Sequence, residues 1–403
     1  MENTMNTRRS MRVLCWVLVA RVVLTDTGLD AQAADLRPTV SALPEYNALF
    51  RRERGWTGAD VSSSVALSED TTLWLYGDTW VGDIREGKHV AATMVNNSVA
   101  LQRGKDPAKS SVEFFYGRGQ DGKPAALIVP ADGRGFFWLQ SGVRTPQGLF
   151  LFAAQVEKSG RADDVFGFRQ VAVWLIEVAN PEQAPTQWRT AQKKIPWSQF
   201  PPQGNKCFGC ALLRHEGFVY VFGCDEDIAR GFHRKHAIVA RVAEADLADF
   251  DRWRFFAAAA WQADFAKAER LFGSAANEYS VSYQPALKKF IAVCTPDGMS
   301  AQIQVRLADS PQGPWGQPAA VYRCPEAQWH KSIFCYAAKG HPSLSTAADE
   351  LIVTYVANST DFRYAAGHAE IYWPRFLRIK FQPAQTEDTV APSNRTGDRP
   401  GGR

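Results

Sequence analysis

The sequence predicts an all-β protein with the fold of a five-bladed β-propeller, in which each blade is a four-stranded antiparallel sheet. Five β-hairpin patterns recur along the 403-residue chain, and in each a short polar turn joins two strands of alternating apolar residues. The second strands end at near-equal intervals of 76, 70, 70 and 63 residues, measured at Gly77, Ala153, Gly223, Val293 and Val356. A long, regular period is typical of repeat architectures, and propellers repeat a four-stranded sheet around a central channel.

Each blade is expected to begin with one of the five hairpins, whose strands are rich in aromatic and β-branched residues. The hairpins cover residues 61–76, 141–152, 211–222, 281–293 and 343–355. Strand-like runs at residues 171–178, 236–242, 303–308 and 370–379 supply outer strands. The segment before Trp56 is expected to complete the last blade and close the ring. A two-sheet sandwich is the alternative, but five similar hairpins at near-equal spacing fit it poorly.

The two ends of the chain are expected to lie outside the propeller domain, which we place at residues 36–383. Residues 1–33 have a basic start, an apolar run at 13–24 and small residues before Ala34, which is the pattern of a signal peptide. Residues 384–403 are polar and rich in Pro and Gly, and we expect them to be disordered. No later run is long enough for a membrane span. The sequence therefore predicts a secreted or periplasmic protein.

Charge and cysteine usage narrow the range of partners. A net charge of +4 is too small to indicate nucleic acid as a partner. Six cysteines follow the signal segment, and Cys324 with Cys335 is one plausible disulfide. Cys207 and Cys210 form a lone CxxC motif without a second ligand pair, and no EF-hand-like loop is present. We therefore predict no metal and no cofactor.

Two aspartates lie at strand ends of the first blade. Asp78 follows the apolar run at residues 73–77, and Asp60 precedes the first strand. In a propeller the start of the innermost strand and the end of the next lie at the same face, so these acids should be neighbours. If Leu67 lies opposite Leu73, Asp60 lies opposite Trp80, within the reach of cross-strand pairs. Neighbouring acids perturb each other's pKa, as acid/base catalysis requires.

The same reasoning brings polar and aromatic residues of other blades to this face. We expect Asp60 and Asp78 to act as nucleophile or base and Glu278 as proton donor. The residues expected to contact substrate are Trp80, Asn97, Trp138, Tyr279, His341 and Asn358. Carboxylates, amides and rings together suit carbohydrate. Each also has a structural explanation, such as a solvated loop acid for Glu278, a turn histidine for His341 or backbone capping for Asp60.

Several motifs resemble the propeller family first catalogued as domain of unknown function 4185. They are GWTGADVS at residues 55–62, LWLYGDTW at 73–80, Asn96-Asn97-Ser98 and KGHPSLS at 339–345. The run ADSPQGPW at 308–315 looks like a phrase found in five-bladed glycosidase propellers. The family includes endo-D-arabinanases of glycoside hydrolase family 183. The resemblance thus implies hydrolysis of furanoside linkages of a polysaccharide or oligosaccharide. We expect the protein to be a monomer. A glycan-binding propeller without activity is the main alternative, and a lyase or transferase on the same fold is another.

Overall fold

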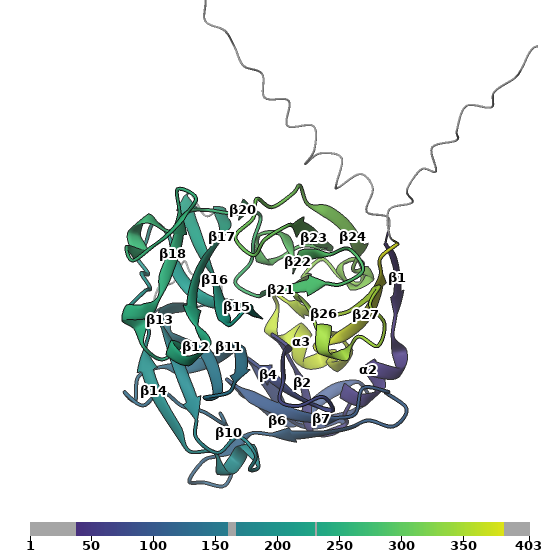
Figure 1. Ribbon diagram of the computed structural model, residues 1–403. Helices are drawn as coiled ribbons and strands as arrows, with labels where there is room; N and C mark the ends of the chain where they lie inside the picture. Colours follow the sequence, from purple (N-terminus) through teal and green to yellow (C-terminus); the bar gives the residue numbers. More distant parts are fainter. Residues whose placement is uncertain (1–37, 160–166, 230–231, 383–403) are drawn as a thin grey trace, which may run out of the picture.

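The computed structural model describes residues 38–159, 167–229 and 232–382 and confirms the five-bladed β-propeller. Five antiparallel sheets surround a common centre (Figure 1). The expected signal peptide and C-terminal tail lie outside the described residues. Within those residues, none of the helices has the length and apolar character needed to cross a membrane.

Four of the predicted hairpins form the inner strands of the first four blades. Blade one contains β3 (Ser63–Ala66), β4 (Thr71–Tyr76), β7 (Ser98–Arg103) and β8 (Ser111–Phe115). Blade two contains β11 (Phe136–Thr145), β12 (Gly148–Lys158), β13 (Phe168–Val178) and β14 (Thr190–Lys194). Blade four contains β21 (Tyr279–Gln284), β22 (Lys289–Cys294), β23 (Gln302–Ala308) and β24 (Ala319–Arg323).

Blade three is larger than the four strands expected. Its main strands are β15 (Lys206–His215), β16 (Phe218–Ala229), β17 (Phe232–Ala243) and β18 (Arg254–Ala257). The outer strand turns back into β19 (Ala260–Gln262), and β20 (Phe272–Gly273) pairs with β17. Strand β17 is much longer than β18, so part of its edge has no partner in β18. Strand β20 pairs with two residues of this part, His236 and Ala237, and so bonds their backbone groups.

Blade five confirms the predicted closure of the ring but corrects the fifth hairpin. Its sheet has the order β1 (Thr39–Ala42), β27 (Arg375–Lys380), β26 (Glu350–Ser359) and β25 (Ile333–Gly340), so the N-terminal strand completes the last blade. The innermost strand is thus Ile333–Gly340 and does not begin at Ser343. Pro342 cannot donate to a sheet ladder, and a 3₁₀ turn at Pro342–Leu344 takes the place of the expected strand.

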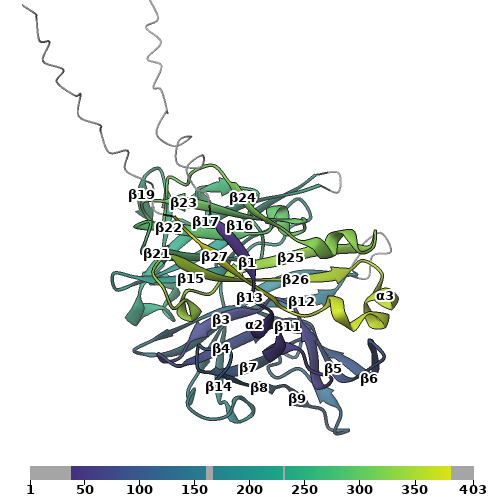
Figure 2. The same ribbon diagram turned by 90° about the vertical axis from the view of Figure 1, so that its right-hand side faces the viewer.

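A three-stranded sheet stands beside blade one at one face of the ring. It has the order β2 (Arg54–Ala59), β5 (Thr79–Arg85) and β6 (Lys88–Val95), with β5 and β6 inserted between β4 and β7. In the side view, β5, β6 and α3 (Phe362–Gly367) lie at the same side of the propeller (Figure 2). The structure also contains the helix α2 (Pro44–Phe50), the short pair β9 (Gly117–Arg118) and β10 (Pro124–Ala125), and several 3₁₀ turns.

The core of the described residues divides into clusters that each fill the space between two neighbouring blades. Leu73 of blade one packs with Leu151 of blade two, for example, and Trp74 of blade one packs with Phe376 of blade five. Every blade packs both faces of its sheet against other parts of the protein. Its strands therefore carry apolar side chains on both faces, and several tryptophans are fully buried. The packed blades hold the inner strands rigidly around the channel.

Candidate functional site

Asp60 and Asp78 lie directly opposite each other at one end of the central channel, which we call the mouth. The backbone N–H of Asp60 donates to the carbonyl of Asp78 over 3.2 Å, and Gly77 N–H donates to the carbonyl of Asp60 over 3.4 Å. The register therefore differs by two residues from the expected one. Val65, rather than Leu67, pairs with Leu73, because the turn closes with Leu67 N–H bonded to the carbonyl of Thr71. Asp60 thus faces Asp78 itself rather than Trp80.

The innermost strands are irregular near the mouth. After Asp60, Val61 and Ser62 adopt left-handed backbone angles, with φ of 69° and 47°. The register also shifts between Leu139 and Ser141, between Phe208 and Ala211, and between Tyr336 and Lys339. Left-handed φ is costly for a β-branched residue such as Val61, and bulges redirect side chains. Such strain is typical of functional sites, since a packing role alone does not need it.

Asp78 is a carboxylate held by two donors. Its Oδ1 accepts hydrogen bonds from Trp138 Nε1 at 2.8 Å and from Asn96 Nδ2 at 3.2 Å. Burial raises the pKa of Asp78, while the hydrogen bonds from Trp138 and Asn96 oppose that rise. Both donors favour the ionised form over the protonated one. Asp78 is thus the acid of the two whose charge is better stabilised.

The carboxyl group of Asp60 accepts fewer hydrogen bonds than that of Asp78. Asp60 Oδ2 accepts a hydrogen bond from the Tyr336 hydroxyl at 2.8 Å, whereas Oδ1 is buried without a hydrogen-bond partner among the described residues. Burial is the largest cause that raises the pKa of Asp60 well above its usual value, and the charge of Asp78 adds to it. Gly77 allows this approach, since a Cβ there would lie 2.5 Å from Asp60 Oδ1. Asp60 is therefore the acid that more readily keeps its proton.

Two tyrosines complete the surroundings of the acids. The Tyr336 hydroxyl accepts from Asn358 Nδ2 at 3.4 Å while it donates to Asp60. The Tyr372 hydroxyl donates to the carbonyl of Asp78 at 3.2 Å. Burial raises the pKa of both tyrosines well above the usual value, so their hydroxyls stay protonated as donors. The structure thus places Asn358 and Trp138 beside the acids, and their expected contact with substrate stays a prediction.

Glu278 lies at the same mouth, just before β21, and is partly exposed. Its charge is close enough to raise the pKa values of Asp60 and of Lys339. It forms no ion pair with a lysine, arginine or histidine in the described parts of the chain. Three carboxylates from two blades therefore gather at one mouth, with Glu278 farther from the directly paired Asp60 and Asp78.

The structure does not support substrate contact by Trp80 or Asn97. Trp80 is 5% exposed, because its ring lies between His89, at a centroid distance of 4.6 Å, and Phe362, at 5.4 Å. Asn97 is fully buried and bonds the backbone of Ile128 and Phe137. The neighbouring Asn96 reaches Asp78 instead, because adjacent residues of an extended chain point to opposite sides.

Tyr279 and His341 are also buried, in the wall of the channel. The Tyr279 hydroxyl donates to the carbonyl of Gly223 at 2.8 Å. His341 Nδ1 bonds Ser64 Oγ and Nε2 bonds Thr354 Oγ1, both at 2.7 Å. Burial lowers the pKa of His341 to about 3, so the ring is neutral. The structure therefore gives His341 the turn-histidine role that was the alternative at the sequence level.

The cysteines described by the structure are buried and free. The disulfide expected between Cys324 and Cys335 is not formed, although the two thiols contact each other. No group of three or more His, Cys, Asp or Glu side chains within the described ranges has the arrangement of a metal site. The CxxC cysteines, Cys207 and Cys210, belong to the packing of blade three.

Comparisons with known proteins concern the chain as a whole. The model of the family described as domain of unknown function DUF5005 matches residues 44–382. A candidate hydrolase from Bacteroides ovatus shares the fold with a TM-score of 0.67 and 18% identity, over 90% of this chain and 98% of that chain.

Two further solved structures are similar at a lower level. The GH43_1 enzyme from Xanthomonas citri in complex with xylotriose has a TM-score of 0.45 and 14% identity, covering 87% of this chain and 100% of that chain. Levansucrase from Bacillus subtilis has a TM-score of 0.44 and 11% identity, covering 81% and 86%. No curated protein matches the sequence. The matching family model differs from domain of unknown function 4185, so the relation to the arabinanases stays a prediction.

Proposed function

We propose that this chain, which belongs to the DUF5005 family, is a glycoside hydrolase that works with Asp60 and Asp78. The observation that carries the proposal is the direct pairing of the two acids at the mouth of the channel. Neither acid has an ion-pair partner in the described portion of the chain, and burial raises both pKa values. Two coupled acids with different hydrogen-bond environments are the basis of glycosidic acid/base chemistry.

The environments of the two acids suggest their roles. Asp60 would donate a proton to the glycosidic oxygen, because its raised pKa keeps it protonated. No internal hydrogen bond at Oδ1 has to break first, since this atom has no partner among the described residues. Asp78, whose charge Trp138 and Asn96 stabilise, would attack the anomeric carbon or activate a water. Glu278 would then act through its charge on Asp60, rather than as the proton donor expected from the sequence.

Furanoside linkages, as in arabinan, are the substrate that we propose. The support is the resemblance of residues 55–62 and 73–80 to the arabinanase-containing family, which includes both acids. The xylotriose complex of the structurally similar Xanthomonas citri enzyme makes xylo-oligosaccharides a second set of substrates to test. We further propose that the protein is exported and acts as a monomer, as the N-terminal pattern and the single-domain propeller suggest.

The test compares the purified protein with Asp60→Asn and Asp78→Asn on arabinans, other furanose polymers and xylo-oligosaccharides. Asp121→Asn is the matched control, since that acid is exposed and forms its ion pair with Lys123 rather than with a residue of the site. We expect sugar release from a furanoside by the wild type and the control, and a loss of about 10²–10⁴-fold in both mouth variants. Equal release by wild type and mouth variants on every substrate would refute the proposal. Calorimetric binding of an oligosaccharide without product would instead support the non-catalytic glycan binder.

If activity is found, the configuration of the first product assigns the role of Asp78. Retention of the anomeric configuration means that Asp78 is a nucleophile, and inversion means that it activates water. Proton NMR of the freshly released sugar distinguishes the two outcomes before the anomers equilibrate.

A further inference from the structure

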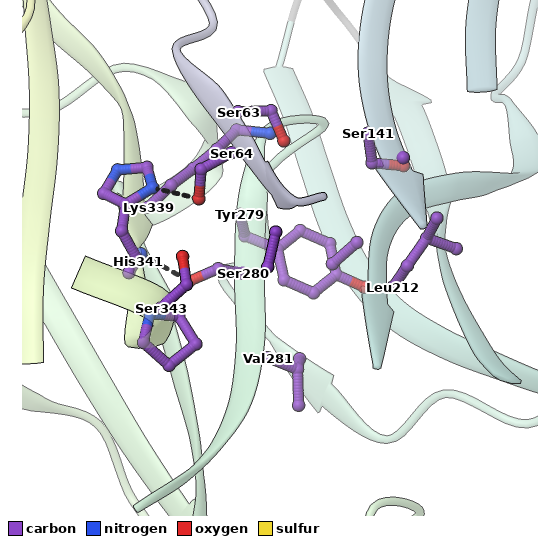
Figure 3. A pocket seen from close by; sticks show the side chains of 15 residues that line it. Ser63, Ser64, Ser141, Leu212, Tyr279, Ser280, Val281, Lys339, His341 and Ser343 are labelled. Atoms are coloured by element: carbon purple, nitrogen blue, oxygen red, sulfur yellow. Dashed lines mark hydrogen bonds between the residues drawn. The ribbon is translucent and has the colours of Figure 1, made fainter. Parts of the chain in front are cut away.

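A cavity of about 150 Å³ lies on the axis of the propeller, walled by the innermost strands of all five blades. Its polar lining includes Ser63, Ser64, Ser141, Ser280 and Lys339. Figure 3 shows Lys339, Ser64 and His341 on one side of the cavity and Ser141 and Leu212 on the other. The volume is well above the ~10–15 Å³ that a single water needs, so a small ion with water can fit.

Lys339 brings a buried positive charge to this cavity. Its side chain is 2% exposed, and its Nζ donates to the carbonyl of Gln140 at 3.1 Å. An ammonium carries three donors, and this is its one hydrogen bond within the described ranges. No aspartate or glutamate of those ranges forms an ion pair with it. Glu278 at the mouth acts on this ammonium through its charge but forms no ion pair with it, so an anion in direct contact would further reduce the cost of burying the charge.

The side chains that line the cavity around Lys339 offer hydrogen-bond donors, and the charge of Glu278 acts on Lys339 from outside this lining. Ser280 Oγ accepts the backbone N–H of Gly340 at 2.7 Å, which leaves its own hydroxyl proton available to the cavity. His341 is neutral and both of its ring nitrogens are bonded to hydroxyls, so it neither repels nor neutralises the ammonium. Among the described residues, the lining contains no carboxylate. This donor set disfavours a cation and suits an anion.

We propose that the channel cavity is a binding site for a halide-sized inorganic anion, held by Lys339 Nζ and the hydroxyl of Ser280. The inference does not depend on the proposed glycosidase activity, because it uses none of the mouth acids. Since the lining comes from five blades, a bound anion would tie the inner strands together. It would bind the folded state and not the unfolded chain, so it would raise the unfolding temperature with saturation.

Crystals soaked in sodium bromide test the proposal directly, because bromide scatters anomalously. We expect an anomalous peak in the cavity within hydrogen-bond distance of Lys339 Nζ in the wild type and none there in Lys339→Met. Bromide confined to surface lysines, or a cavity peak that persists in Lys339→Met, would overturn the proposal.

Thermal unfolding in solution gives a second readout that does not require crystals of a variant. Bromide should raise the unfolding temperature of the wild type saturably beyond sodium gluconate of equal ionic strength, since gluconate is far larger than a halide and does not have its compact charge. Lys289→Met, which removes a surface lysine paired with Asp309, should keep this bromide effect. Ser280→Ala should need about tenfold more bromide for half-saturation, as expected when one hydrogen bond to a charged ligand is lost. Equal effects of bromide and gluconate, or an unchanged half-saturation in Ser280→Ala, would contradict the site.

Discussion

Replacing Trp138 by Phe should make the stability of the protein more sensitive to pH. The change keeps an aromatic ring in place but removes the 2.8 Å hydrogen bond from Nε1 to Asp78 Oδ1. A hydrogen bond to a charged group contributes about 1.5–3 kcal/mol. The pKa of Asp78, already raised by burial, should therefore rise further in Trp138→Phe, because one of the two hydrogen bonds that oppose the rise is lost.

The sign of the effect follows from the raised pKa. The unfolded chain ionises Asp78 near pH 3.9, while the folded state resists ionisation, so stability falls as the pH rises from about 4 to the folded pKa. In Trp138→Phe this fall continues to a higher pH. The variant should thus match the wild type closely below pH 4 and be about 1.5–3 kcal/mol less stable at pH 7.

Denaturant unfolding between pH 3.5 and 8 measures this difference. Trp174→Phe is the matched control, because Trp174 Nε1 donates to the neutral amide oxygen of Gln155 at 2.9 Å in the same blade. Its stability loss should be the same at every pH. If Trp138→Phe loses equal stability at pH 3.5 and pH 7, or none at either, the indole does not stabilise the charge of Asp78 and the reasoning fails.

Three further predictions concern single buried side chains. Asp60→Asn should unfold at a higher temperature than the wild type at pH 7 and at the same temperature below pH 4, because the folded state disfavours the Asp60 charge; equal unfolding temperatures at pH 7 would contradict this. Asn97→Ala should lose about 3 kcal/mol or more in denaturant unfolding, since its three buried bonds to the backbone are lost; a loss below 1 kcal/mol would count against its packing role. Burial lowers the pKa of Lys339 from 10.5 to about 8. Keeping this lysine charged in the folded state therefore costs about 3 kcal/mol of stability at pH 7, and the cost fades as the pH rises from 8 to 10.5. In halide-free buffer Lys339→Met should therefore be more stable than the wild type at pH 7, by denaturant unfolding, with the gain shrinking toward pH 10.5; a less stable variant at pH 7 would refute the account.

The fold could be predicted because local patterns repeat. Each hairpin carries its own turn and alternation, so the blade count and four of the five hairpins follow from sequence. The fifth hairpin begins earlier in the chain than predicted, because the polar run after Pro342 forms a 3₁₀ turn and not a strand. The strand Ile333–Gly340 ends where Pro342 prevents further pairing. The extra strand β20 of blade three pairs with the part of β17 that β18 leaves without a partner, which no local pattern reveals.

The sequence predicts the two acids of the site but not all of the residues that surround them. Asp60 and Asp78 adjoin short, strongly patterned strands, so even a register error of two residues kept them together. Tyr336 was missed because it lies inside a strand whose bulge turns it toward Asp60, and bulges leave little sequence signal. Asn96, and not the predicted Asn97, reaches Asp78, because the side to which each of these adjacent residues points depends on the register.

The crystal structure of the Asp78→Asn variant with a bound furanoside oligosaccharide tests the central claim most directly. The claim is that Asp60 protonates the leaving oxygen while the residue at position 78 faces the anomeric carbon. We predict a glycosidic oxygen at about 2.6–3.2 Å from the Asp60 carboxyl group, with the anomeric carbon on the side of position 78. A sugar bound at the mouth with its glycosidic oxygen out of reach of Asp60, or bound elsewhere on the propeller, would contradict the account.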